Sequence, residues 1–157
     1  MPKTAAKPFT PAQERFGTTV IGLMSAANVW LYRLTGGWLG GRFPGGAPVC
    51  LVTVRGRKSG QLRTVPLLYL ERGSDIVIVA SKGGMPTNPD WYHNLLANPE
   101  VTVELGAETF KARATPVTDG PERDRLYAKM VEVMPGFADY EAKTTRKIPV
   151  VLLDRVS

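Results

Sequence analysis

The chain has 157 residues, 43% of them hydrophobic and 22% charged, which is the balance of a globular protein with enough chain for one core. Its net charge is +6, and its single cysteine excludes an internal disulfide framework. The N-terminus lacks the apolar core of a signal peptide, and the longest apolar-rich run, Thr18 to Trp30, is too short and too polar to span a bilayer, so we expect a cytoplasmic protein.

Residues 1–48 are expected to form an N-terminal arm, an amphipathic helix and a linker. The helix opens at Thr10-Pro11, where threonine suits the N-cap and proline the first turn, and it ends at Gly36-Gly37. Apolar residues recur along it at helical spacing and form one stripe: Phe16, Val20, Leu23, Ala27, Trp30 and Leu34.

From Val49 onward the pattern changes to alternation, which predicts strands. We expect strands at Val49–Arg55, Leu62–Leu70 (interrupted by Pro66), Ile76–Ala80, Val101–Leu105, Thr109–Val117 and Ile148–Asp154. Helices are expected at Asp90–Ala97 and from about Gly120 to Met134, with loops at Lys82–Pro89 and Pro135–Lys147. Six mostly antiparallel strands with flanking helices predict a mainly β, α+β fold, in which residues 49–157 form a closed or split β-barrel.

The turn between the first two strands is strongly basic. Arg55, Arg57, Lys58 and Arg63 surround it without an acid, but Arg57 stands where a phosphate-binding loop needs glycine, and a strand follows instead of a helix. Lys82 ends the third strand, so all five cations could meet at one end of the barrel. There they would repel one another without an anionic partner. A solvated hairpin turn is the alternative.

Two further stretches could line a site. In Ser81–Gly84, a small hydroxyl residue, a lysine and two glycines let a ligand approach the backbone closely. In the next helix, Asn88 could be the cap. Trp91 could face the core with Leu95, while Tyr92 and His93 would point elsewhere and Asn94 could be merely exposed. The only histidine, His93, and the lack of a Cys/His cluster exclude a multi-histidine metal site, so an enzyme here would depend on an organic cofactor.

Four segments in unbroken order resemble the deazaflavin-dependent nitroreductase family of actinobacteria: TVRGRKSGQLRTVPLLYL, IVIVASKGG, NPDWYHNLLANPEVTVEL and IPVVLLDR. The resemblance covers roughly residues 49–155. Members of the family are split β-barrel oxidoreductases that use coenzyme F420. The resemblance therefore implies hydride transfer from C5 of the reduced deazaflavin to an electron-poor, conjugated small molecule, with the protein supplying orientation and electrostatics.

The resemblance also assigns residues. It implies that the phosphate and oligoglutamate tail of F420 are held by Arg57, Lys58, Ser59, Arg63 and Lys82. The ring and tail cleft would be lined by Pro66, Leu67, Ser81, Gly83, Asn88, Trp91 and Asn94, with Ser81 as the polar candidate for catalysis. Substrate would face Met134, Phe137 and Tyr140; the alternative for Phe137 and Tyr140 is packing onto the barrel. Since two of these places lack the tyrosines of nitroimidazole-reducing members, we expect quinones, enones or unsaturated lactones, with nitro compounds less favoured.

Three alternatives stay open at this point: an FMN-dependent split-barrel oxidoreductase, a non-catalytic deazaflavin carrier, and a nucleic-acid-binding module. Against nucleic acid, the aromatic residues are not interleaved with the cations. The N-terminal helix resembles the family's amphipathic leader, which is linked to membrane-surface quinones. We therefore expect it either to bind the inner face of the membrane peripherally or to pack on the barrel. The sequence leaves the oligomeric state undecided.

Overall fold

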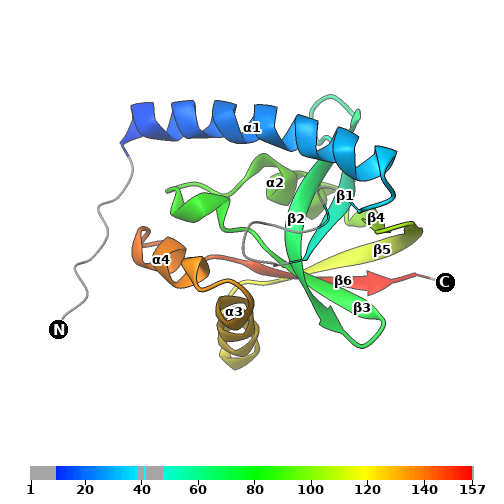
Figure 1. Cartoon of the computed structure of the whole chain (residues 1–157). Coiled ribbons are helices and arrows are strands. Elements are labelled where there is room, and N and C mark those ends of the chain that lie inside the picture. Colours follow the sequence, from blue (N-terminus) through cyan, green and yellow to red (C-terminus); the bar gives the residue numbers. More distant parts are fainter. Residues whose placement is uncertain (1–9, 39–40, 42–47, 157) are drawn as a thin grey trace.

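The structure, a computed structural model, describes residues 10–38, 41 and 48–156, apart from the side chains of residues 16–25. Six strands form one closed barrel in the order β1-β2-β3-β6-β5-β4, and every neighbouring pair is antiparallel (Figure 1). The strands are β1 Val49–Arg55, β2 Leu62–Arg72, β3 Asp75–Val79, β4 Glu100–Leu105, β5 Glu108–Val117 and β6 Val150–Arg155. The predicted fold class is confirmed, with every strand within two residues of its expected bounds.

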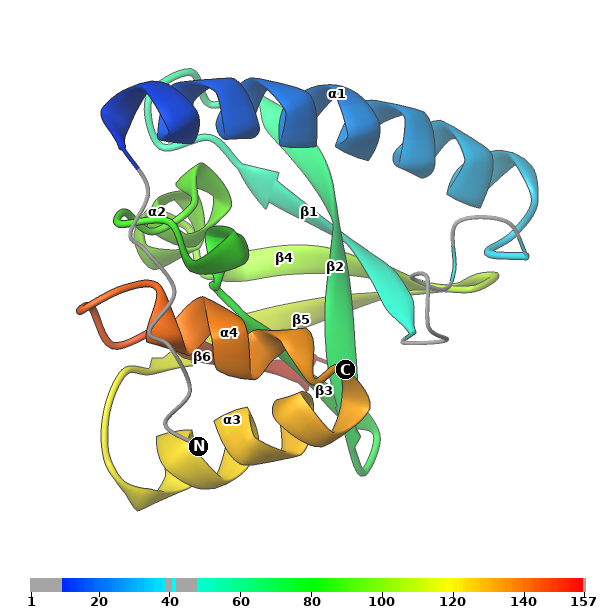
Figure 2. The same ribbon diagram turned by 60° about the vertical axis from the view of Figure 1, so that its left-hand side comes forward.

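The helices are α1 Pro11–Leu34, η1 Lys82–Gly84, α2 Asp90–Ala97, α3 Pro121–Val133 and α4 Gly136–Ala142. Figure 2 shows α2, α4 and α3 on one side of the barrel, with α1 lying across it. The short helices η1 and α4 lie where loops were expected. Pro135 and Gly136 look like helix breakers, but Pro135 directly precedes α4, a position from which its missing N–H interrupts no helical hydrogen bond.

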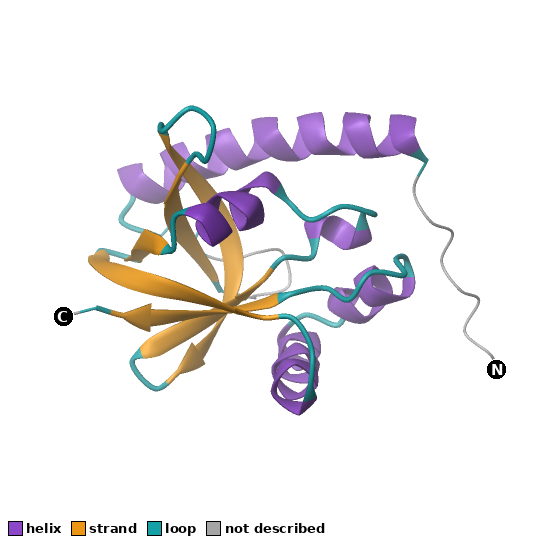
Figure 3. Cartoon of the chain, turned by 180° about the vertical axis from the view of Figure 1, so that it is seen from behind, coloured by secondary structure: helices purple, strands orange, loops and turns teal. Residues whose placement is uncertain are grey.

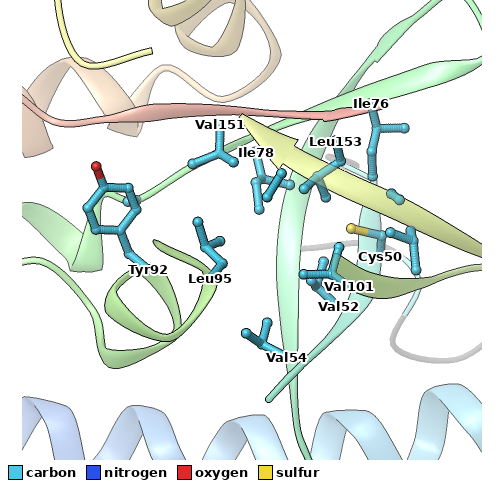
Figure 4. Packing of buried hydrophobic residues seen from close by; sticks show 14 of the residues in the cluster. Cys50, Val52, Val54, Ile76, Ile78, Tyr92, Leu95, Val101, Val151 and Leu153 are labelled. Carbon is cyan, nitrogen blue, oxygen red and sulfur yellow. The ribbon is translucent and has the colours of Figure 1, made fainter. Parts of the chain in front are cut away.

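The core has two parts, because β3 is buried on both faces. Ile76 and Ile78 point into the barrel, where they meet Cys50, Val52 and other inward residues (Figure 4). Val77 and Val79 alternate with them and pack outward against α3 and α4. The second cluster fixes the two C-terminal helices to the barrel wall.

Strand β2 is longer than either of its partners and changes partner along its length. Its first seven residues, 62–68, pair with β1, and its last four, 69–72, pair with β3. Among the described residues, the edge of 62–68 away from β1 has no strand on it. Pro66 lies in this half, so its missing N–H is tolerated and β2 runs through it without the predicted interruption.

Helix α1 is fixed to the barrel near its C-terminal end. The Tyr32 hydroxyl donates to the carbonyl of Glu104 (3.2 Å) and accepts from the N–H of Gly106 (2.6 Å), while Arg33 forms an ion pair with the Glu104 carboxylate at 3.0 Å. Of the predicted apolar stripe, Trp30 and Leu34 are 64% and 67% exposed, so that stripe does not make this contact.

The stripe positions Phe16, Val20 and Leu23 lie outside the described side chains. No helix among the described residues is both long enough and apolar enough to cross a membrane. The division of the chain at residue 48 into an arm and a barrel domain stays a prediction.

Candidate cofactor site

The two basic turns lie at the same end of the barrel. Because β1, β2 and β3 are successively antiparallel, the end of β1 and the end of β3 point in one direction. We call this the site end; it consists of turn 56–61, loop 80–89, helix α2 and segment 134–149. The other end, the hairpin end, carries the tight turns 73–74 and 106–107. Figure 3 shows η1, α3 and α4 to the right of the strands, and Figure 2 shows the turn between β1 and β2 near α2, away from the β2-β3 and β4-β5 turns.

Helix α2 holds the basic turn through Asn94. The Asn94 side-chain oxygen accepts from the backbone N–H of Arg57 (3.1 Å) and from its Nη1 (2.7 Å). Asn94 is 6% exposed, so the alternative of an exposed Asn94 is wrong. Because this oxygen is already committed to Arg57, Asn94 orients the turn. The Arg57 guanidinium also lies 3.8 Å from the Asp90 carboxylate, which is largely exposed, so this cation has an acidic neighbour that the sequence did not reveal.

The turn has four exposed cations, of which Arg55 and Arg57 are held by hydrogen bonds within the described residues. Arg55 donates to the carbonyl of Gly60 at 2.7 Å, and the Ser59 hydroxyl accepts from the N–H of Gln61 at 3.2 Å, so both side chains shape the turn. Lys58 and Arg63 are exposed, and no acidic partner for either lies within the described part of the chain. Arg55 has no acidic partner among the described residues either, but it is held by the Gly60 carbonyl, so Lys58 and Arg63 are the two cations left for a ligand.

Lys82 has a counter-ion from the N-terminal helix. Its ammonium lies 3.3 Å from Oε1 of Glu14 and 3.1 Å from the Thr87 hydroxyl, which itself donates to Glu14 at 2.5 Å. The hydrogen bond from Thr87, with Lys82 assisting, holds the pKa of Glu14 below its ordinary value. An anion that binds Lys82 must therefore compete with Glu14.

Loop 80–89 has an unusual backbone. Lys82 has a φ of 47°, and Gly83 and Gly84 follow at 63° and 81°, so three consecutive residues are left-handed. A Cβ on Gly84 would lie 2.6 Å from the carbonyl oxygen of Tyr140, so the loop packs directly on the backbone of α4. Asn88 does not cap α2: Pro89 takes the N-cap position, and the Asn88 side chain accepts from Arg146 at 2.7 Å.

The predicted substrate positions flank this loop at different depths. Phe137 is 4% exposed and packs against Tyr127 in the outer core cluster, which matches the packing alternative for this residue. Met134 and Tyr140 are half-buried at the edge of the same cluster. Burial raises the pKa of Tyr140, so its hydroxyl stays protonated at neutral pH.

The ring-lining positions come from three elements. Pro66 and Leu67 lie in the half of β2 whose outer edge has no strand among the described residues. Ser81 directly precedes η1, and its side chain makes no capping hydrogen bond. Trp91 is half-buried and packs against the barrel core, while its neighbour Tyr92, expected to point elsewhere, is buried in that core.

Two other features of the described residues do not compete with this site. An open hollow lined by Tyr32, Trp38, Tyr69 and Gly106 lies at the hairpin end, away from the basic turn. No group of three or more His, Cys, Asp or Glu side chains in the described part of the chain is arranged to hold a metal ion.

Comparison with known proteins decides the family. The model of the F420H(2)-dependent quinone reductase family matches residues 24–155. The chain belongs to this family. An F420H(2)-dependent quinone reductase of Mycobacterium tuberculosis is 42% identical to it over 127 residues, which cover 80% of this chain and 85% of that protein.

Two solved structures agree with this assignment. The structure of an F420-H2 dependent reductase is 41% identical, covers 68% of this chain and 94% of its own, and superimposes with a TM-score of 0.63. A second, described as a domain-swapped dimer, is 34% identical, covers 87% of this chain and 98% of its own, and gives a TM-score of 0.66. The protein is an F420-dependent oxidoreductase, so the expected cofactor is confirmed over FMN.

Proposed function

We propose that this member of the F420H(2)-dependent quinone reductase family reduces a quinone with a hydride from F420 bound at the site end. The observation that carries the proposal is the pair of exposed cations, Lys58 and Arg63, on a turn fixed by Asn94. An acidic tail supplies the charge that these cations lack, and charge-assisted hydrogen bonds are strong when both partners are present. The donors at this end therefore fit an anionic cofactor.

In this arrangement the anionic part of the cofactor lies along the basic track formed by Arg57, Lys58, Ser59, Arg63 and Lys82. Its ring lies beside Pro66 and Leu67, where β2 offers an apolar surface without a covering strand among the described residues. When bound in its reduced form, F420 supplies the hydride. The chain contributes binding and orientation, and it keeps water from the reacting atoms.

The quinone is proposed to bind beside Met134 and Tyr140, next to the place where loop 80–89 packs on helix α4. The Ser81 hydroxyl, which is not used for capping, is the proposed donor of a hydrogen bond to the substrate carbonyl oxygen. Hydride addition leaves a hydroquinone anion, and a proton from this hydroxyl or from water completes the reduction. Phe137 supports the pocket from the core side.

The first test is a fluorescence titration of the purified protein with F420 and, in parallel, with FMN, followed by a turnover assay with menadione. Saturable binding of F420 alone, with oxidation of F420H2 that depends on menadione, is the expected result. Tight binding of FMN instead would refute the cofactor assignment. Binding of F420 without turnover of any quinone would leave a deazaflavin carrier.

The proposal also covers the membrane. Near the C-terminal end of α1, Trp30, Leu34 and Trp38 are 64%, 67% and 84% exposed, and this apolar surface is proposed to contact the inner face of the membrane peripherally. Co-sedimentation with anionic vesicles should be lost in a Trp30→Ser, Leu34→Ser variant that still binds F420. A concentration-dependent dimer that ignores vesicles would instead assign this surface to a second copy of the chain.

A further inference from the structure

Arg146 is enclosed by the loop that carries Lys82. It lies half-buried in the segment between α4 and β6, and its guanidinium reaches both flanks of η1. Nε donates to the carbonyl of Met85 (3.0 Å), and Nη2 donates to the carbonyl of Ser81 (2.8 Å). Nη1 donates to the Asn88 side chain (2.7 Å), and both Nη atoms reach the carbonyl of Ala80 at 3.3 Å.

The conformation of the loop explains why such a partner is needed. Lys82 is the only non-glycine residue with positive φ among the described residues, a conformation that costs free energy and persists only where the surroundings enforce it. Arg146 binds carbonyls on both sides of Lys82 and so closes the loop around it. Only a planar guanidinium with several donors can reach acceptors spread in this way; a lysine ammonium cannot.

We propose that Arg146 is a positioning residue: it fixes loop 80–88 so that Lys82 and Ser81 face the cofactor, and it acts on cofactor binding through Lys82. All three guanidinium nitrogens are already engaged by protein acceptors, so Arg146 itself does not need to touch the ligand. Since Arg146 follows α4, and Gly84 packs on the Tyr140 backbone, the same contacts join the loop to the proposed substrate segment. The inference rests on the proposed function.

The first experiment needs no cofactor. Hydrogen–deuterium exchange of the peptide covering residues 80–88 is measured in Arg146→Lys and in the parent protein. Losing hydrogen bonds to a charged donor should speed exchange in this peptide by about tenfold. Lys147→Gln is the matched control, because Lys147 is the next cation along the chain but pairs with Asp119 and Asp124 on the surface. Unchanged exchange in Arg146→Lys would overturn the inference, whether or not F420 binds.

The second experiment is a double-mutant cycle with Lys82→Ala, read by F420 titration. Arg146→Lys should weaken F420 binding about tenfold in the parent protein and hardly at all when Lys82 is already absent. Additive losses would mean that Arg146 meets the ligand independently, which refutes action through Lys82. If the parent protein binds no F420, the proposed function fails, and the exchange experiment alone decides the role of Arg146.

A milder variant guards against loss of folding. Asn88→Ala removes one acceptor of Arg146 and leaves every backbone carbonyl in place. It should speed exchange in the same peptide by a smaller factor than Arg146→Lys. If Arg146→Lys does not fold, unchanged exchange in Asn88→Ala refutes the proposed fixation of the loop.

Discussion

The two ends of the barrel differ in whether their cationic side chains have acidic partners. At the hairpin end, Arg72 lies near the carboxylates of Glu122 and Asp154. Arg155 pairs with Glu108, and its guanidinium stacks over the Phe110 ring. At the site end, Lys58 and Arg63 have no acidic partner within the described residues. These two cations without an acidic partner are close together on one turn. In the proposed function, their counter-charge arrives with the ligand.

The connections between strands also differ at the two ends of the barrel. Tight turns close the hairpin end, whereas the site end has long connections whose conformations depend on specific side chains. Asn94 fixes the basic turn, and Arg146 fixes the loop of Lys82. Helix α1 contacts both ends of the barrel. Glu14 pairs with Lys82 at the site end, and Tyr32 hydrogen-bonds to Glu104 of β4 and to Gly106 in the turn after it. Substitutions made at one end at a time test whether cofactor binding depends on the site end alone.

The largest effect on ligand binding is expected from Lys58→Ala combined with Arg63→Ala. Loss of two charge-assisted hydrogen bonds should weaken F420 binding by about a hundredfold, with a smaller loss for an analogue lacking the glutamate tail. The measurement is a fluorescence titration with cofactors of different tail length. Arg72→Ala, which removes a cation from the hairpin end, is the control and should leave the affinity unchanged. Equal losses in both variants would mean that the charge asymmetry has no role in binding.

Asn94→Ala should come next and should affect both folding and binding. It leaves the Arg57 N–H without its buried acceptor, which costs about 1–3 kcal/mol of unfolding free energy. Urea unfolding measures that loss, and F420 titration should show a weaker complex because the basic turn is released. Asn94→Asp keeps the acceptor oxygen and should recover most of the stability. A fully stable Asn94→Ala would contradict the positioning role.

Glu14→Gln should have a smaller effect, and in the opposite direction. It removes the carboxylate that competes for Lys82, so F420 affinity should rise a few-fold at low salt, as expected for a partly exposed ion pair worth roughly 0.2–1 kcal/mol. Glu122→Gln at the hairpin end is the matched control and should change nothing. Weaker binding in Glu14→Gln would show that Glu14 supports the lysine instead of competing with the ligand.

The smallest effect is a dependence of stability on pH. The folded pKa of Glu14 is lowered, so its contribution to the unfolding free energy is present above its ordinary pKa of 4.5 and is lost as the pH falls through the folded value. The free energy of unfolding of the parent protein should therefore be a few tenths of a kcal/mol higher than that of Glu14→Gln at pH 6, and this difference should vanish in acid. Urea unfolding at both pH values measures it. A difference in unfolding free energy that grows in acid would contradict a stabilising Glu14 carboxylate.

Local patterns predicted the scaffold well. Val49–Arg55 and Asp90–Ala97 have the expected bounds, because alternation marks a strand and an Asn-Pro pair follows the helix. Helix α4 was missed because its glycine and the preceding proline also suit a loop. Tyr92 and Asn94 were misplaced because helical spacing favoured the face of Trp91, while the contact with Arg57 decides the burial of Asn94.

The site was predictable only where charge accumulates in sequence. The basic turn is visible because its cations are neighbours. The pairing of Glu14 with Lys82 joins residues 68 positions apart, and the acceptors of Arg146 are mostly backbone carbonyls, which have no signature in the sequence. Contacts of this kind depend on the tertiary fold.

The position of Cys50 in the barrel wall gives the protein its own reporter of opening. The thiol is fully buried, burial raises its pKa above the ordinary value, and the chain has no second cysteine. A thiol reagent can therefore react only when β1 separates from its neighbours. The rate of labelling, followed by intact mass, reports how often the barrel wall parts, without any engineered probe.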